Sequence, residues 1–253
     1  FGIEFRLHFT WFIIFILVTV TLISPDYSRW QNWIIGIITS LLFFASVVAH
    51  ELAHSLVGRA QGIPIQSITL FIFGGVAQMT QEATRPGDEL KMAAAGPLTS
   101  LVLGGLFGLL WFLFPSKSEP IAIMIFWLAI MNGALAMFNL IPGFPLDGGR
   151  VFRSILWYLT GSYRRSTLIA TRVGQSVGYL FILSGILIIF LRLFGSSWLD
   201  ALSWFDGVWL VFIGGFLGSI ASASYRQIPW QETFGDHTSS ASSPDLPVPP
   251  DSR

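Results

Sequence analysis

Cysteine is absent from this 253-residue sequence, and charged residues are scarce. Without cysteine the chain has no disulfide, no iron–sulfur cluster, no thiolate nucleophile and no cysteine-ligated zinc. A metal would have to be bound by nitrogen and oxygen atoms. Charged residues make up 11% of the chain, against roughly 25% in soluble domains. The formal net charge is zero, so the basic excess that nucleic-acid binding needs is missing, and we expect no nucleic-acid partner.

Hydrophobic residues make up 53% of the chain, and its mean hydropathy is +0.67. Such a surface must be hidden from water, and a lipid bilayer is the obvious partner. Apolar runs of about 20 residues are long enough to cross the hydrocarbon core. Six runs qualify, at residues 9–23, 34–59, 90–114, 121–140, 176–194 and 204–222. The predicted fold class is therefore an all-α polytopic membrane protein with six transmembrane helices.

Lysine and arginine residues in the flanks of these runs predict the orientation. If the N-terminus is cytoplasmic, eleven of the 14 basic residues lie on the cytoplasmic side and three lie outside. Basic residues favour the cytoplasmic side of a membrane. We therefore expect a multi-pass protein of the cell membrane with both termini in the cytoplasm.

Two connections between the spans have patterns of their own. Residues 63–81 are rich in β-branched and aromatic residues and partly alternate polar with apolar, which predicts short membrane-associated strands, bent at Gly74 and Gly75, between helices 2 and 3. After the fourth span, Pro142 and Pro145 deny the backbone two donors, which predicts that helix 4 is broken there.

The last part of the chain differs in composition from the rest. Residues 225–253 are rich in Ser and Pro, and such a segment cannot bury a core. We expect residues 1–224 to form the transmembrane domain and residues 225–253 to be a disordered cytosolic linker. Linkers usually connect domains, so we also expect a C-terminal regulatory domain beyond residue 253.

The second span contains the ionisable residues His50, Glu51 and His54. Histidines at i and i+4 lie one turn apart on one helix face, so both imidazoles can reach one ion. Glu51 lies about 100° around the helix from His50, where its carboxylate can reach a water on that ion. The alternative is a pair of buried histidines bonded to backbone carbonyls. An ionised glutamate among apolar residues costs several kcal/mol, which argues against a chance occurrence of this pattern.

A third metal ligand is predicted in the broken segment, where Asp147 precedes Gly148 and Gly149. Its carboxylate would complete a two-histidine, one-carboxylate site and leave one position for water. An ordinary turn aspartate is the alternative. Glu51 precedes Arg59 by eight residues, or about 12 Å of helix. The site should therefore be buried in the membrane toward its cytosolic side.

Taken together, these motifs resemble the site-2 protease family of intramembrane zinc metalloproteases. His50 to His54 match the family's His-Glu-x-x-His motif, and Asn139, Pro142 and the segment 145–148 match its Asn-x-x-Pro-x-x-Pro-Leu-Asp-Gly motif. Phe73, Gly74 and Gly75 look like the family's Gly-Gly loop. Six spans resemble the microbial branch whose members often carry C-terminal CBS modules.

The resemblance implies cleavage of a peptide bond within or next to a transmembrane segment, with release of a cytosolic product. It implies one Zn²⁺ per chain and a single-span membrane substrate, such as a membrane-anchored transcription regulator or anti-sigma factor. Glu51 would be the catalytic base, and Asn139 would bond the substrate backbone or the developing oxyanion. Phe73, Gly74 and Gly75 would bind the substrate as an added β-strand.

Asn132 lies two turns before the second motif and is a further candidate for substrate binding, with helix–helix hydrogen bonding as the alternative. Two other functions would use the same site. A metal or proton transporter could relay ions through the His, Glu and Asp side chains, although transporters usually have paired broken helices and only one broken segment is evident. A non-catalytic membrane scaffold would have no use for the charge of Glu51.

Overall fold

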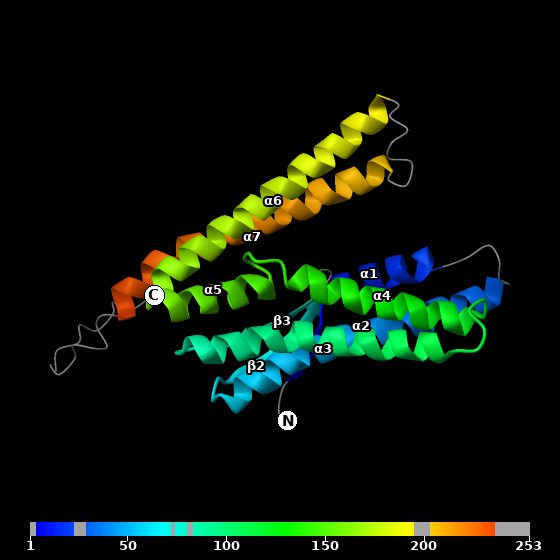
Figure 1. The fold of residues 1–253 in the computed structure, drawn as a ribbon, viewed down its shortest axis with the longest axis horizontal. Helices are drawn as coiled ribbons and strands as arrows, with labels where there is room; N and C mark the ends of the chain where they lie inside the picture. The colour runs from blue at the N-terminus through cyan, green and yellow to red at the C-terminus, as the bar shows by residue number, and fades with distance from the viewer. Residues whose placement is uncertain (1–3, 23–28, 72–73, 80–82, 195–202, 236–253) are drawn as a thin grey trace, which may run out of the picture. The chain divides into compact units, whose positions relative to one another are not determined.

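The protein is described by a computed structural model that covers residues 4–22, 29–71, 74–79, 83–194 and 203–235 (Figure 1). The chain divides into two compact units, residues 1–174 and 175–253.

The first unit is built of helices with a small sheet. Its helices are α1 (Thr10–Thr21), α2 (Arg29–Ala60), α3 (Pro86–Leu113), α4 (Pro120–Asn139), α5 (Asp147–Thr160) and the beginning of α6 (Tyr163–Leu193). Helix α3 packs against α2, α4 and α5, and α2 also contacts α1 and α4. In Figure 1, α2, α3 and α4 run alongside one another. Helix α3 is therefore central to the unit.

Local sequence explains where two of these helices begin. Pro86 and Pro120 occupy the first turns of α3 and α4, where a missing N–H costs nothing and the fixed φ suits a helix. Asp88 and Glu89 lie in the first turn of α3, where acidic side chains complement the helix dipole. Pro97 lies inside α3 and removes one backbone donor, which membrane helices tolerate when neighbouring helices surround them.

Five helices of the described residues are long and apolar enough to cross a membrane. They are the segment Trp33–Ala60 of α2, all of α3, α4 and α6, and the segment Trp204–Ser222 of α7. The protein is thus a mostly helical, multi-pass membrane protein, as predicted. The first predicted span corresponds to α1, which has 12 residues and a length of about 18 Å. The count of six spans is therefore not confirmed.

A three-stranded sheet lies beside α2. Strands β2 (Ile65–Phe71) and β3 (Gly74–Met79) are antiparallel, and β1 (Glu4–Leu7) pairs with β2 in parallel. The order is β1-β2-β3, so β3 is an edge strand of the sheet described. Ile68 of β2 is fully buried and forms a core cluster with Leu70 and with Val47 of α2. The two strands between α2 and α3 were predicted, whereas β1 was not.

The broken segment between α4 and α5 packs tightly by means of its glycines. A Cβ at Gly149 would come within 2.5 Å of the Phe144 nitrogen, and one at Gly143 would come within 2.8 Å of the Gly174 nitrogen. The Phe144 amide donates to the carbonyl of Ala170. After this turn the chain forms a separate amphipathic helix, α5, which begins at Asp147 and was not predicted.

The second unit consists of the rest of α6 and α7 (Trp204–Gly235). A Cβ at Gly178 would lie 2.9 Å from the Gly214 carbonyl oxygen, and one at Gly207 would lie 2.7 Å from the Gly185 carbonyl oxygen. The two helices thus approach through glycines two turns apart. Helix α7 continues to Gly235. Residues 236–253 lie outside the described residues, and the linker and regulatory domain stay predictions.

Candidate metal centre

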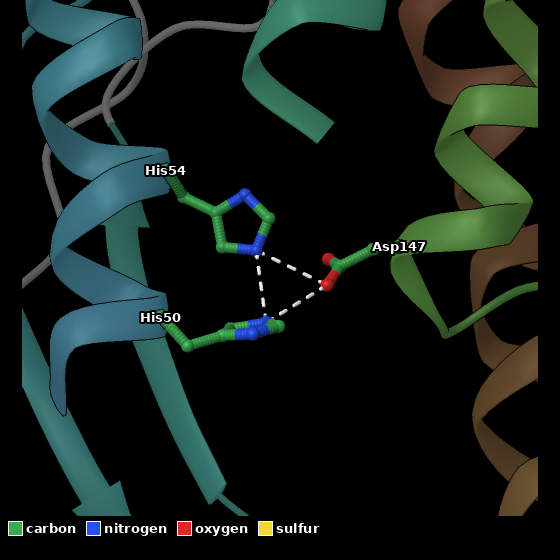
Figure 2. A group of neighbouring side chains, drawn as sticks. All are labelled: His50, His54 and Asp147. Atoms are coloured by element: carbon green, nitrogen blue, oxygen red, sulfur yellow. Dashed lines mark hydrogen bonds and ion pairs between the residues drawn. The ribbon is translucent and has the colours of Figure 1, made fainter. Parts of the chain in front are cut away.

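Three side chains from two distant parts of the sequence meet at one point (Figure 2). His50 and His54 extend from α2, and Asp147 approaches from the first turn of α5. The Asp147 Oδ2 atom lies 3.1 Å from each Nε2 atom, and the two Nε2 atoms are 3.2 Å apart. Among the described residues, the side chains of His50, His54 and Asp147 form a group that could hold a metal ion.

The spacing suits a tetrahedral ion. Ligand atoms about 2.0–2.1 Å from a zinc ion lie about 3.3 Å apart in a regular tetrahedron, close to the separations observed here. A glycine keeps the centre open, because a Cβ at Gly96 of α3 would lie 2.6 Å from the His50 Nε2 atom and would also overlap the His54 Nε2 atom. The residues present therefore fit a zinc ion.

The second nitrogen of each imidazole is held from α3. The His54 Nδ1 atom donates to the Met92 carbonyl oxygen at 2.7 Å, and the His50 Nδ1 atom is joined to the Ser100 hydroxyl by a 2.9 Å hydrogen bond. A carbonyl can only accept, so Nδ1 of His54 carries a proton and Nε2 presents its lone pair. The Nε2 lone pair of a neutral His54 and the Asp147 carboxylate oxygen face one another, an arrangement that suits a cation between them. The same arrangement of outer partners orients histidine ligands in metal sites generally.

Glu51 lies next to the edge strand β3. A Cβ at Gly75 would come within 2.7 Å of the Glu51 Cδ atom, so the absence of a side chain at Gly75 gives the glutamate its space. Glu51 is partly buried and follows His50 directly in α2. The structure thus brings together an acid, a metal-binding cluster and a strand edge.

The other predicted site residues have different surroundings. Asn139 ends α4, and its amide donates to the Leu135 carbonyl of the same helix. The Asn132 amide donates to the hydroxyl of Ser46 in α2 at 3.3 Å, which is the helix–helix hydrogen bond considered as the alternative. Gly74 begins β3, and Phe73 lies outside the described residues. Substrate roles for these residues stay predictions.

Sequence reasoning missed the supports that α3 provides. Met92 acts through its backbone carbonyl, which any residue type would supply, so no sequence signal exists. Ser100 and Gly96 are common residue types in membrane helices. Gly96 and Ser100 follow Glu89 at intervals that place the three residues on one face of α3. This periodicity was the sequence signal available for the supports.

The match to a known family covers the metal centre. The model of peptidase family M50 matches residues 38–122 and 116–185, a range that contains all three candidate ligands and Glu51. This chain belongs to peptidase family M50. The resemblance deduced from the motifs is thereby confirmed, since a solved structure similar to this M50 chain is that of a site-2 protease from Methanocaldococcus jannaschii. That structure has a TM-score of 0.60 and 31% identity, and the match covers 88% of this chain and 91% of the other.

Two curated relatives of this M50 chain are similar in sequence. A Synechocystis sp. protein whose name places it among zinc metalloproteases is 47% identical over 211 residues, which is 81% of this chain and 55% of that protein. A zinc metalloprotease of Methanocaldococcus jannaschii is 38% identical over 186 residues, which is 74% of this chain and 52% of that protein. The chain spans about half the length of these curated relatives.

Proposed function

We propose that this chain is a zinc-dependent endopeptidase that hydrolyses a peptide bond within or next to a transmembrane segment of a single-span membrane protein. The observation that carries the proposal is the convergence of the His50, His54 and Asp147 ligand atoms, with Glu51 beside them. The two histidines and Glu51 lie on α2, a helix long and apolar enough to cross a membrane. Family membership and the names of the relatives support it. One zinc ion per chain would bind the three ligand atoms.

Zinc in such a site supplies Lewis-acid chemistry that activates water and polarises the scissile carbonyl. Glu51 then has the role of general base and acid: its carboxylate takes a proton from the attacking water and delivers it to the leaving amine. The Met92 carbonyl and the Ser100 hydroxyl keep both Nε2 atoms directed at the ion. Asn139 has the proposed role of bonding the substrate backbone or the oxyanion. One N–H of its amide donates to the Leu135 carbonyl, and the amide has a second N–H for this role.

The substrate has to be extended, because a helical substrate hides its carbonyls. Strand β3 pairs with β2 on one side, and its Gly75 lies against Glu51. A substrate segment added along the side of β3 that pairs with no strand among the described residues would pass the catalytic carboxylate. In this proposal Phe73, Gly74 and Gly75 bind the substrate backbone, and Asn132 contributes from α4.

The membrane arrangement is also part of the proposal. Six spans with both termini in the cytoplasm agree with the distribution of basic residues, and α1 would then have to cross together with residues beyond its helical part. The metal centre would be buried in the membrane on the cytosolic side of its midplane, because it lies near the end of α2 that carries Arg59. The product would be released to the cytosol.

The test compares the wild-type full chain with Glu51→Gln after reconstitution in lipid vesicles. Single-span reporter proteins are included, release of a soluble fragment is followed, and zinc content is measured in both proteins. We expect equal zinc content and a fragment-release rate reduced about 10²–10⁴-fold in the variant, the range typical of a general acid–base group. Unchanged release would contradict the role of Glu51. Zinc uptake into vesicles without any fragment would favour a transporter.

A further inference from the structure

A buried ion pair joins α3 to α5 close to the metal centre. Glu89 of α3 is 1% exposed and Arg153 of α5 is 7% exposed. The Arg153 Nε atom donates to Oε1 of Glu89 at 2.8 Å, and its Nη2 atom donates to the same oxygen. Arg150 of α5 places its Nε atom 3.8 Å from that oxygen. The other oxygen, Oε2, is buried and has no hydrogen-bond partner among the described residues, so Glu89 depends on α5 for its polar contacts.

Fold stability is a poor explanation for this pair. Burying two charges costs desolvation energy that their attraction often fails to recover, and well-packed apolar residues can replace such pairs without loss of stability. A buried pair does impose geometry, because its hydrogen bonds form in one arrangement only. The role of the ion pair therefore depends on which parts of the structure it keeps in position.

Arg153 contacts two aromatic rings in addition to Glu89. Its guanidinium carbon lies 4.9 Å from the ring centre of Phe144 and 4.7 Å from that of Tyr163. Phe144 belongs to the turn that leads into Asp147, and Tyr163 begins α6. A planar guanidinium can stack on rings and bond a carboxylate at the same time, which lysine cannot do. Arg153 thus connects α3, the turn and α6 through one side chain.

Helix α3 already orients the other two ligands. Glu89, Met92, Gly96 and Ser100 are buried on one face of this helix. Met92 and Ser100 hold the two imidazoles of α2 directly, and Glu89 reaches α5, whose first residue is Asp147. Each of the three ligands is therefore tied to the same face of α3. A slide or rotation of α5 along α3 would move the Asp147 carboxylate away from the imidazoles.

We propose that Glu89 and Arg153 are positioning residues that set the third metal ligand, Asp147, against the two histidines. The pair fixes the register of α5 on α3, and the Phe144 contact fixes the turn. This inference rests on the metal site of the proposed function. It predicts that loss of the pair weakens zinc binding even where the protein keeps its fold.

The test measures the zinc dissociation constant of the purified full chain in detergent, by competition with a chromophoric chelator. The main variant carries Glu89→Met and Arg153→Met together, which removes both charges and leaves no unpaired one. Thermal unfolding of the zinc-free protein reports the fold. The matched control is Thr19→Val, which removes a buried hydrogen bond to Ser40, between α1 and α2.

We expect the paired methionine variant to unfold at a temperature no lower than the Thr19→Val control and to bind zinc about 10–100-fold more weakly, as loss of outer partners does in other metal sites. If it does not fold, the second variant is Arg153→Lys, which keeps the charge but cannot bond the carboxylate and stack on both rings at once; we expect the same weakening of zinc binding. Wild-type zinc affinity in the folded variant would overturn the inference.

A ligand variant separates this inference from the proposed function. Asp147→Asn is expected to lose tight zinc binding. If Asp147→Asn binds zinc as the wild type does, the metal site itself is wrong. If it loses zinc while the Glu89 and Arg153 variants keep it, the metal site stands and the positioning role is wrong.

Discussion

Replacing Gly96 by alanine should abolish tight zinc binding while leaving α3 helical. The new Cβ would lie 2.6 Å from the His50 Nε2 atom, whereas ordinary contact begins near 3.4 Å. The imidazole would have to move by about 0.8 Å, several times the roughly 0.2 Å tolerance of zinc–ligand distances. The His54 Nε2 atom is also overlapped, so neither histidine could keep its place.

We expect the zinc dissociation constant of Gly96→Ala to rise at least about 100-fold, which corresponds to about 2.8 kcal/mol. Chelator competition on the detergent-purified protein measures it, and circular dichroism checks the helix content. Gly105→Ala is the matched control, since Gly105 lies on the same helix and a Cβ there would meet nothing within 4 Å. Equal zinc affinity in the two variants would refute the geometry of the metal centre.

Three further changes test other parts of the structure. Ser100→Ala removes the hydroxyl that bonds the first ligand histidine, and we expect about 10-fold weaker zinc binding in the chelator assay; an unchanged constant would contradict the orienting role. Gly75→Val puts methyl groups in the space of the Glu51 side chain, so reporter cleavage should fall at least about 10-fold while zinc content stays constant; full cleavage would refute this contact. Gly178→Leu should destabilise the α6–α7 pair by about 1–3 kcal/mol in a denaturation assay. Gly215→Leu, with open space at its Cβ, should not. Equal stabilities of the two variants would contradict the packing of α6 against α7.

The metal centre could be predicted from the sequence because helix geometry alone brings His50 and His54 together. Their spacing puts both imidazoles on one face of α2 whatever the surrounding fold. Helix geometry alone does not predict the position of Asp147, because the distance of its carboxylate from the histidines depends on the tertiary packing of the turn and α5. Asp147 could be proposed as a ligand because prolines and glycines marked a break in an apolar run, and acceptable metal ligands were few in a chain without cysteine.

Other elements could not be predicted in this way. Strand β1 alternates polar and apolar residues from Glu4 to Leu7, but its parallel pairing with β2 depends on a segment about 60 residues away. Helix α5 has no apolar run of membrane length, so a search for spans assigned its residues to a connection. The predicted third span began after Glu89, and the burial of that carboxylate against Arg153 appears only when α3 and α5 are packed together.

In the proposed metal site, His50, His54 and Asp147 hold one zinc ion. X-ray absorption at the zinc edge, on the purified chain, measures this directly and needs no substrate. We expect one zinc per chain with two imidazole ligands and oxygen ligands at about 2.0–2.2 Å, and a changed, weaker site in Asp147→Asn. A chain that retains no zinc, or an Asp147→Asn spectrum identical to that of the wild type, would contradict it.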